Sequence, residues 1–508
     1  MPSPGQLLGM PGRFTSWYPG QLEAHKHMMS WLHGPKRFFC LQTPTGGGKS
    51  ALGALTAILG DRKAIIATVT KGLQEQLIKD FATLGMRDVR GQANYSCVED
   101  SSVTVDNGPC HRGYDCMYRQ RGCHYYDALG LAISSPLVVT NYSYLLAQEQ
   151  YSETGLGPRD LLICDEAHLI DRVLTSHFGV SISHYELARA LCTLPGRFEN
   201  MEQWRRWAYA QSRQSRKVKT TTSQQQRRIN DLTRKLDQIA KASDDWVWEL
   251  EHDVIRLGPV WLANYASHLF GDRPKVILMS ASLVPKDVQL LGLDPSECEW
   301  HQGGNVYPAE NAPVYHINTV PISYKSSDDD LRLWTARIDQ ILDRRADRKG
   351  IIFTVSYQRQ QFLLEHSRHA GRMITHDRHN TIDKVDEFRR LGPGAVLVSP
   401  AVAFGWDVPS QECEYVIIGK VPWPSTQDPI SQRRREEDKD WAPLVAMSTV
   451  VQCAGRGQRT PTDLCEVLIT DDNWRWFWAK YKYLAPSWFH SRVCGSLDTI
   501  PQPIGGAI

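Results

Sequence analysis

The chain has 508 residues, 42% of them hydrophobic and 22% charged, and its 58 Lys and Arg nearly balance its 56 Asp and Glu. This composition is that of folded domains with sizeable cores and excludes a mainly disordered chain, while the net charge of +2 argues against nucleic-acid binding through bulk charge. Twelve cysteines are too few for a disulfide-stapled secreted scaffold.

The absence of targeting features sets the expected compartment. No run approaches the 18 or so apolar residues of a membrane-spanning helix, and the first twenty residues lack the basic start and apolar centre of a signal peptide. We therefore expect a cytoplasmic protein with reduced thiols and no membrane contact. The length predicts three or four structural units of about 150 residues each.

The first informative segment alternates strands and helices. Apolar residues at helical spacing predict a helix over residues 21–33, and a short apolar run predicts a strand over 37–41. A glycine-rich turn follows at residues 42–50. Further along, we predict helices over 51–59 and 71–83 and strands over 64–70, 137–140 and 160–164. This alternation is typical of a doubly wound α/β fold with a mostly parallel sheet.

Two stretches interrupt this alternation. Residues 93–127 carry four cysteines and little periodicity, whereas residues 172–270 are mainly helical in pattern, with no clear strand. Within the second stretch, residues 201–240 hold ten Lys or Arg and three acids, a net charge of +7. With Trp204, Trp207 and Tyr209 beside it, this segment fits either a nucleic-acid path or a solvated helix face.

A second α/β pattern occupies the rest of the chain. A strand predicted at residues 276–279 precedes this pattern, whose own predicted strands are residues 350–354, 395–398, 415–418 and 466–469. The charged run at residues 431–440 is expected to be a solvated helix face. Two α/β units joined in one chain are therefore predicted.

The turn between the first strand and the next helix has the composition of a phosphate loop. Thr43–Ser50 reads Thr-Pro-Thr-Gly-Gly-Gly-Lys-Ser, with Thr43 in place of the usual first Gly. Glycines let backbone N–H groups close around phosphate oxygens at a helix N-terminus. Lys49 would neutralise the β- and γ-phosphates, and Ser50 would hold Mg²⁺. The predicted nucleotide-binding residues are Thr45, Gly46, Gly47, Gly48, Lys49 and Ser50.

Two adjacent carboxylates end the strand that precedes the long helical stretch. Leu161–His168 reads Leu-Leu-Ile-Cys-Asp-Glu-Ala-His, so Asp165 and Glu166 lie where the strand ends. Asp165 is expected to hold Mg²⁺ through water, and Glu166 to position and activate the attacking water. Together with the phosphate loop, these residues predict ATP hydrolysis.

With this phosphate loop and the Asp-Glu-Ala-His segment, the sequence resembles the superfamily 2 helicases. The resemblance implies that His168 couples the nucleotide state to the second unit, with Ser280 and Ser282 of a Ser-Ala-Ser segment in the same role. It also implies that Gln21 contacts adenine. In the second unit, the resemblance implies that Gln452 helps place the attacking water and that Arg456 and Arg459 reach the γ-phosphate. It also implies that Gly405 and Asp407 belong to a Gly-x-Asp motif, in which Asp407 orients the arginines.

The four clustered cysteines are Cys97, Cys110, Cys116 and Cys123, separated by 12, 5 and 6 residues. Four thiolates suit an iron–sulfur cluster or structural zinc, but neither short gap has the two-to-four-residue spacing that zinc usually recruits. A four-cysteine insertion between the phosphate loop and the carboxylate pair resembles the XPD/DinG family of iron–sulfur helicases. The resemblance implies that these cysteines hold a [4Fe–4S] cluster in a small domain that helps to separate strands, and that residues 172–270 form an arch domain.

The expected fold is α/β, with two RecA-like doubly wound parallel-sheet lobes and both an iron–sulfur domain and a short helical arch inserted in the first lobe. Lobe 1 is expected at residues 1–92, 128–171 and 271–300, the iron–sulfur domain at 93–127, the arch at 172–270, and lobe 2 at 301–508. The resemblance also implies a monomeric, ATP- and Mg²⁺-dependent DNA helicase that translocates 5′ to 3′ on single-stranded DNA and unwinds forked or other DNA structures.

Two other functions stay open at this stage. One is a DNA-dependent ATPase that remodels protein–DNA complexes or RNA–DNA hybrids without processive unwinding. The other is a non-enzymatic DNA-binding subunit, against which the complete set of Lys49, Asp165, Glu166, Arg456 and Arg459 argues.

Overall fold

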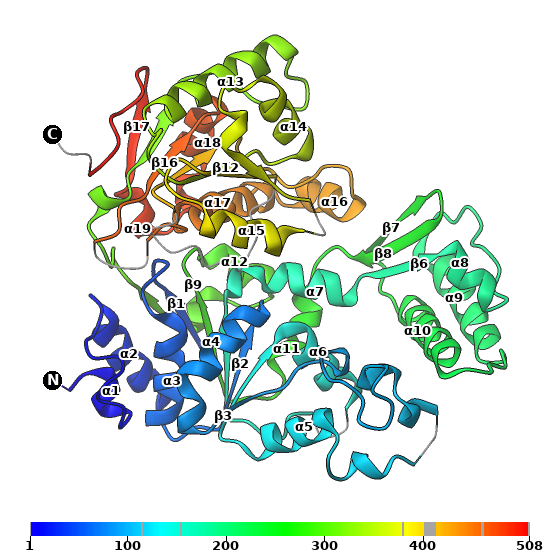
Figure 1. Cartoon of the computed structure of the whole chain (residues 1–508). Coiled ribbons are helices and arrows are strands. Elements are labelled where there is room, and N and C mark those ends of the chain that lie inside the picture. The colour runs from blue at the N-terminus through cyan, green and yellow to red at the C-terminus, as the bar shows by residue number, and fades with distance from the viewer. Residues whose placement is uncertain are drawn as a thin grey trace.

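The computed structural model describes residues 2–112, 115–152, 155–377, 380–400, 413–458 and 462–505. Two seven-stranded sheets, each with parallel strands throughout, form two lobes that lie one above the other, and a third part projects to the side (Figure 1). The predicted α/β class with two parallel-sheet lobes is confirmed. Among the described helices, none combines the length and apolarity that a membrane crossing requires.

The sheet of lobe 1 has the order β10-β1-β9-β5-β2-β4-β3. Its strands are β1 (Phe38–Gln42), β2 (Ala64–Thr68), β3 (Met86–Asp88), β4 (Leu137–Asn141), β5 (Leu161–Asp165), β9 (Lys275–Ser280) and β10 (Glu299–Gln302). Its helices are α1 (Pro4–Leu7), α2 (Gln21–Leu32), α3 (Lys49–Leu59), α4 (Lys71–Phe81), α5 (His124–Ser134), α6 (Tyr142–Tyr151) and α12 (Pro285–Leu290).

Both faces of this sheet are buried, as its apolar strands require. Along β1, Phe38 and Cys40 belong to one hydrophobic core, whereas Phe39 and Leu41 belong to another. Since successive strand residues point to opposite faces, the two cores lie on the two sides of the sheet. This is the doubly wound arrangement that the sequence predicted, and it places the carboxyl ends of the parallel strands at one edge.

Lobe 2 repeats the arrangement with the order β13-β14-β12-β15-β16-β11-β17. Its strands are β11 (Val314–Ile317), β12 (Gly350–Phe353), β13 (Met373–Thr375), β14 (Val396–Ser399), β15 (Tyr415–Ile418), β16 (Glu466–Ile469) and β17 (Val493–Leu497). Its helices are α13 (Asp328–Asp343), α14 (Tyr357–His366), α15 (Thr381–Arg390), α16 (Pro429–Glu437), α17 (Trp441–Ala454), α18 (Asn473–Tyr481) and α19 (Ser487–His490).

The segment between β5 and β9 begins with α7 (Ile170–Phe178) and ends with α11 (Ala266–Phe270), whose buried residues belong to a hydrophobic core of lobe 1. The part between these two helices projects to the right in Figure 1 and contains the helices α8 (His184–Arg189), α9 (Met201–Ser215) and α10 (Ser223–Ala240). It also contains an antiparallel sheet of β6 (Val180–Ser183), β7 (Trp246–Glu251) and β8 (Val254–Pro259). The expectation of no strand in this stretch was therefore wrong, because short two-residue alternation is hard to separate from polar helix patterns.

The tryptophans of this projecting part are structural. Trp204 is fully buried and Trp207 is 9% exposed, and both belong to the core between α9, α10 and the small sheet. They are therefore unavailable to stack on nucleic-acid bases. Tyr209, two residues after Trp207 on α9, is 60% exposed.

Helix α16 differs from the expectation that residues 431–440 form a solvated helix face. Within the charged run at residues 431–440, Arg434 is only 3% exposed and reaches across to α7. Its guanidinium donates to Asp171 Oδ2 at 2.8 Å and to Thr175 Oγ1 at 3.2 Å. This helix is thus a contact between lobe 2 and the base of the projecting part, and only some of its charges face solvent.

Candidate nucleotide site between the two lobes

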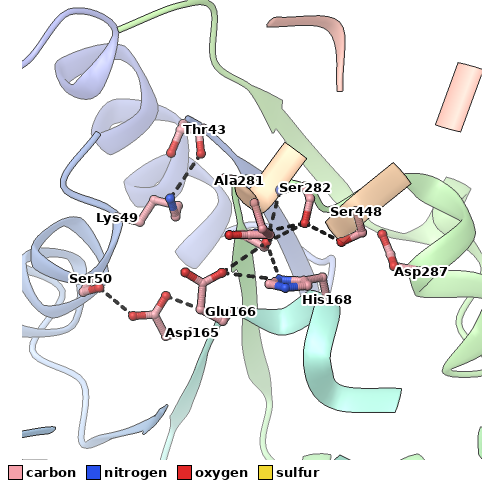
Figure 2. Close-up of polar contacts among 12 residues, drawn as sticks. Thr43, Lys49, Ser50, Asp165, Glu166, His168, Ala281, Ser282, Asp287 and Ser448 are labelled. Carbon is pink, nitrogen blue, oxygen red and sulfur yellow. Dashed lines mark hydrogen bonds and ion pairs between the residues drawn. The ribbon is translucent and has the colours of Figure 1, made fainter. Parts of the chain in front are cut away.

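The phosphate loop lies between β1 and α3, as predicted. Gly46 and Gly48 have φ angles of 80° and 68°, values that favour glycine, and Gly48 is the N-cap of α3. Lys49 is the first residue of that helix and is 8% exposed. Its Nζ donates to the carbonyl oxygens of Thr43 and Pro44, both at 3.2 Å (Figure 2). The lysine thus reaches back over the loop in which phosphate oxygens would be bound.

The paired carboxylates face this loop from the end of β5. Ser50 Oγ donates to Asp165 Oδ2 at 2.5 Å, and the backbone N–H of Glu166 donates to Asp165 Oδ1 at 2.9 Å (Figure 2). Glu166 has a φ of 51°, so the chain turns sharply after the strand. The turn brings Glu166 to the same side as Asp165, although adjacent strand residues would point to opposite faces.

A chain of polar contacts runs from Glu166 toward lobe 2. His168 Nδ1 lies 3.3 Å from Glu166 Oε2 and 2.7 Å from Ser280 Oγ, at the end of β9 (Figure 2). Ser280 Oγ is 3.4 Å from Ser282 Oγ. Because β9 lies between β1 and β5 in the sheet, this serine segment emerges between the phosphate loop and the carboxylates.

Ser282 carries the contact across the gap between the lobes. Its hydroxyl lies 2.9 Å from Ser448 Oγ and accepts a hydrogen bond from Gln452 Nε2 at 3.1 Å, both on α17. The side chains of Glu166, His168, Ser280, Ser282 and Gln452 therefore form one continuous polar path. Of these, His168, Ser280 and Ser282 were expected to act in coupling.

The two adjacent carboxyl groups are in different electrostatic situations. Burial raises the pKa of Asp165, and the neighbouring Glu166 charge raises it further, against the hydrogen bond from Ser50. Burial also opposes ionisation of Glu166, but His168 and the charges of Lys49 and Arg456 outweigh it and lower its pKa. Glu166 is thus held as a carboxylate, the form that accepts a proton from water or orients it.

A single cavity of about 1420 Å³ joins these groups. Its walls include the phosphate loop, Asp165, Glu166 and His168 from lobe 1, and Gln452 and Arg456 from lobe 2. Within the described residues, two hydroxyls of the phosphate loop are buried without a hydrogen-bond partner, that of Thr45, which lines the cavity, and that of Thr43 at the start of the loop. Unsatisfied buried hydroxyls beside a cationic glycine loop suit an anionic, oxygen-rich ligand such as a nucleoside triphosphate.

Gln21 lies at the same cavity, on the first turn of α2. Its Oε1 accepts from the backbone N–H of Tyr18 at 3.1 Å, and its Nε2 would lie 2.7 Å from a Cβ placed on Gly48. The glutamine thus packs directly on the phosphate loop, with Tyr18 and Phe14 further along the same wall.

Comparisons with known proteins agree with this geometry. Residues 14–184 match the family model described as type III restriction enzyme, res subunit, and residues 340–492 match that of a helicase C-terminal domain. Segments of the ATP-dependent DNA helicase YoaA are similar, at 26% identity over 208 residues in Escherichia coli (strain K12) and 23% over 211 residues in Haemophilus influenzae. These matches cover 29% and 30% of this chain and about a third of each relative, 32% and 33%.

The fold comparison extends over the whole chain. The solved structure XPD_Helicase superposes with a TM-score of 0.66 at 15% identity, covering 94% of this chain and 99% of that one. The chain is therefore similar in fold to that structure, and two of its segments match the two family models. The cavity that holds the predicted nucleotide-binding residues lies between the two parallel-sheet lobes.

Three residues that the XPD/DinG resemblance implied lie outside the described part of the chain. These are Gly405, Asp407 and Arg459. Their roles stay predictions. Arg456 is described, is 9% exposed and lines the cavity.

The four clustered cysteines gather in an irregular segment beside lobe 1. Cys97, Cys116 and Cys123 are each at most 8% exposed, and a Cβ on Gly108 would lie 3.1 Å from Cys97 Sγ and 3.8 Å from Cys110 Sγ. Burial raises the pKa of Cys110, and the nearby Cys116, Cys97 and Cys123 raise it further. Yet among the described residues no three His, Cys, Asp or Glu side chains have the arrangement of a metal site. All twelve cysteines are free thiols.

Sequence reasoning missed two residues that contact the predicted site, Ser448 beside Ser282 and Tyr307 beside Gly46. Ser448 belongs to a mostly apolar helix and carries no motif, and Tyr307 lies in the connection between the lobes. Tyr307 donates from its hydroxyl to the carbonyl of Gly46 at 3.0 Å. Only their position in the folded chain identifies them, since neither residue type nor spacing distinguishes them from ordinary core positions.

Proposed function

We propose that this protein is an ATP-dependent DNA helicase that translocates on single-stranded DNA, in the 5′ to 3′ direction, and unwinds forked DNA. The observation that carries the proposal is the convergence of Lys49, Ser50, Asp165 and Glu166 from lobe 1 with Arg456 from lobe 2 on one cavity. A cavity shared by two lobes lets nucleotide binding and hydrolysis alter their separation, which is how such proteins step along a strand.

Each of these side chains has a chemical task in phosphoryl transfer. Lys49 neutralises the β- and γ-phosphates, Glu166 orients the attacking water and accepts its proton, and Arg456 stabilises the charge that develops on the γ-phosphate. Gln452, bonded to Ser282, helps to place the water.

The site also fits Mg²⁺, which neutralises phosphate charge when bound. The Ser50 hydroxyl and the Asp165 carboxylate are hydrogen-bonded to each other at 2.5 Å. Mg²⁺ prefers such oxygen ligands, with water and phosphate oxygens completing its shell. Ser50 and Asp165 are therefore the residues that we propose would hold it.

Replacement of the phosphate-loop lysine tests the ATPase part of the proposal. Lys49→Ala is expected to abolish ATP hydrolysis stimulated by single-stranded DNA while leaving the thermal unfolding midpoint nearly unchanged, because the substitution removes the cation that holds the β- and γ-phosphates. Lys71→Ala, at an exposed position that begins α4 and also lines the cavity, serves as the matched control. Robust turnover by Lys49→Ala would contradict the assignment.

We further propose that Cys97, Cys110, Cys116 and Cys123 hold a [4Fe–4S] cluster. Four thiols on one short segment provide the ligand set that such clusters require. The proximity of Cys97 Sγ and Cys110 Sγ to the same position beside Gly108 supports a common site, as does the effect of the other three cysteines on the pKa of Cys110. Bound there, the cluster would tie together a segment whose described residues form short 3₁₀ turns and an isolated β-bridge between Ser96 and Thr104.

Metal content of anaerobically purified protein tests this second part. We expect brown protein with about four iron atoms per chain, and loss of iron in Cys116→Ser. Cys192→Ser, at a cysteine on the projecting part, should retain full iron content. Four-thiolate zinc without iron would refute the cluster assignment and leave the ATPase assignment intact.

The unwinding activity itself is separable from ATP hydrolysis. We propose that the segment at residues 93–127 and the part at residues 172–270 border the path of the DNA strand, since cationic side chains of both lie over aromatic rings. Arg119 lies over the half-buried ring of Tyr126, and Arg234 lies over the exposed ring of Tyr151 at the end of α6. Strand-displacement assays with forked DNA and RNA–DNA hybrids, beside an ATPase assay, distinguish unwinding from remodelling without unwinding.

A further inference from the structure

The connection between the lobes runs directly along the phosphate loop. Residues 303–313 join β10 of lobe 1 to β11 of lobe 2. At its start, the N–H of Gly303 donates to the carbonyl of Gln42 at 2.7 Å, and a Cβ on Gly303 would lie 2.7 Å from Thr43 Cγ2. The connection therefore begins in contact with the residues that open the phosphate loop.

The same connection is held by lobe 2 two residues later. Asn305 Nδ2 donates to Ser491 Oγ at 2.7 Å, and Asn305 Oδ1 accepts from Arg492 Nε at 3.1 Å. Ser491 and Arg492 directly precede β17, so they move with lobe 2. A shift of lobe 2 therefore moves Asn305, which lies in the connection close to the phosphate loop.

Tyr307 is the residue of the connection that hydrogen-bonds to the phosphate loop. Its side chain is 2% exposed, its hydroxyl donates to the carbonyl of Gly46 at 3.0 Å, and its ring meets that of Tyr18 edge-on. A Cβ on Gly46 would lie 3.2 Å from the Tyr307 hydroxyl, and a Cβ on Gly47 would lie 3.2 Å from Val306 Cγ2. Gly46 and Gly47 thus leave room, because they lack a Cβ, for the connection to pack against one side of the loop. The other side of the loop is where phosphate would bind.

The hydrogen bond to Gly46 has a consequence for the next peptide group. In a trans peptide the carbonyl of one residue and the N–H of the next point in opposite directions. With the Gly46 carbonyl held by Tyr307, the Gly47 N–H turns into the loop, where it donates to the carbonyl of Pro44 at 3.2 Å. A bound phosphate would compete with that carbonyl for the N–H and for the Lys49 ammonium.

Lobe 2 meets the same glycine from the other side. A Cβ on Gly46 would lie 2.9 Å from the backbone carbonyl oxygen of Gln458, two residues after Arg456. The Gly46 peptide is therefore the point where phosphate loop, interlobe connection and arginine segment all touch.

We propose that Tyr307 is a positioning residue that couples occupancy of the phosphate loop to the connection between the lobes, an inference that rests on the proposed ATP site. Its hydroxyl orients the Gly46–Gly47 peptide for phosphate binding. Movement of that peptide when phosphate binds is passed through the phenol to residues 303–313 and so to lobe 2.

The test compares Tyr307→Phe, which keeps the ring and removes the hydroxyl, with Tyr324→Phe, the same change at a residue that is 85% exposed. A fluorescent ADP analogue reports affinity, and hydrogen exchange with and without ADP follows the amides of residues 303–313. Thermal unfolding shows that each variant is folded.

Tyr307→Phe is expected to weaken ADP binding about 3- to 10-fold, the effect of one lost hydrogen bond. It should also abolish the ADP-dependent change in exchange of residues 303–313 while the phosphate-loop amides remain protected by ADP. Tyr324→Phe should behave as the unaltered protein. Unchanged affinity and an unchanged linker response in folded Tyr307→Phe would overturn the inference alone, whereas no ADP binding by the unaltered protein would overturn the proposed function with it.

Discussion

At the scale of single residues, the nucleotide cavity and its surroundings place charged groups in environments that shift their protonation. Asp287 is a clear case outside the catalytic set, in the first turn of α12. Its Oδ2 accepts from the N–H of Val284 at 2.8 Å, which caps the helix. Burial raises its pKa to about 7, and the charge of Asp171 adds to the effect. The cap thus depends on a carboxyl group that is costly to ionise.

This shift predicts how stability depends on pH. The folded-state pKa of about 7 exceeds the ordinary value of 3.8. Between these values the folded chain retains a proton that the unfolded chain releases, so stability falls as pH rises through that window. Asp287→Asn keeps an oxygen for the cap and cannot ionise. We expect it to be about 1 to 3 kcal/mol more stable than the unaltered protein at pH 8 and nearly equal to it at pH 4, as measured by urea unfolding.

A lower stability of Asp287→Asn at pH 8 would show that the ionised carboxylate makes a favourable contact. Asp294→Asn is the appropriate control, because Asp294 also caps a short helix through Ser296 N but its pKa is lowered, so this variant should gain no stability at pH 8.

At the scale of elements, the part that projects from lobe 1 is joined to the cysteine segment by a specific contact. On α10, Arg227 pairs with the Asp106 carboxylate and donates to the Asp106 carbonyl at 3.0 Å and to Asn107 Oδ1 at 3.1 Å. Asp106 lies between Cys97 and Cys110, and the Arg227 charge helps to lower its pKa against the effect of burial. Other cations of the +7 segment are also paired, such as Arg216 with Asp237 and Lys235 with Glu186. The segment is therefore less basic at its surface than its sequence implied.

Breaking this contact should loosen the cysteine segment without unfolding the lobes. Arg227→Ala and Asp106→Ala are each expected to cost roughly 1 kcal/mol, and the double variant little more than either, since the pair is only partly exposed. Hydrogen exchange at residues 92–112 measures the local effect.

Arg206→Ala is the matched control, because its partner Glu202 lies on the same helix. It should leave exchange at residues 92–112 unchanged. Additive losses in the Arg227 and Asp106 variants would contradict a direct coupling between the two elements.

At the scale of the whole molecule, the two lobes touch at the nucleotide cavity itself. Gly455, which ends α17, faces the phosphate loop so closely that a Cβ there would lie 3.0 Å from Thr45 Cβ and nearer still to its hydroxyl. Trp488 of lobe 2 also donates to the carbonyl of Ala281 at 3.0 Å. Approach of Arg456 to lobe 1 therefore depends on a small residue immediately before it.

Gly455→Ala should hold the lobes slightly apart. We expect ATP turnover to fall about 10- to 100-fold because the arginine is displaced from the reacting phosphate, while ADP affinity, set mainly by lobe 1, changes little. Steady-state kinetics and ADP titration measure the two effects. Gly371→Ala, whose Cβ would meet nothing within 4 Å, is the control. If Gly455→Ala turned over ATP as fast as the unaltered protein, closure of the lobes would not depend on the close approach of Gly455 to Thr45.

The sequence by itself determined the local chemistry of this protein. Lys49, Ser50, Asp165 and Glu166 were identified because a glycine loop at a strand-to-helix turn and carboxylates at a strand end have a direct physical signature in order and spacing. Strands such as β1, β2 and β5 were predictable for a related reason, since buried parallel strands read as short apolar runs.

Only the tertiary structure decided which distant residues complete the site. Tyr307 and Ser448 are common residue types without a motif, and they matter because chain packing brings them to Gly46 and Ser282. Trp204 and Arg434 both lie in segments that the sequence allowed to face solvent, yet both are buried. Trp204 is buried by the pairing of α9 with α10, and Arg434 by the contact of α16 with α7, and no local pattern encodes either contact. Local sequence fixes the chemistry that a segment can perform, whereas long-range packing fixes which segments perform it together.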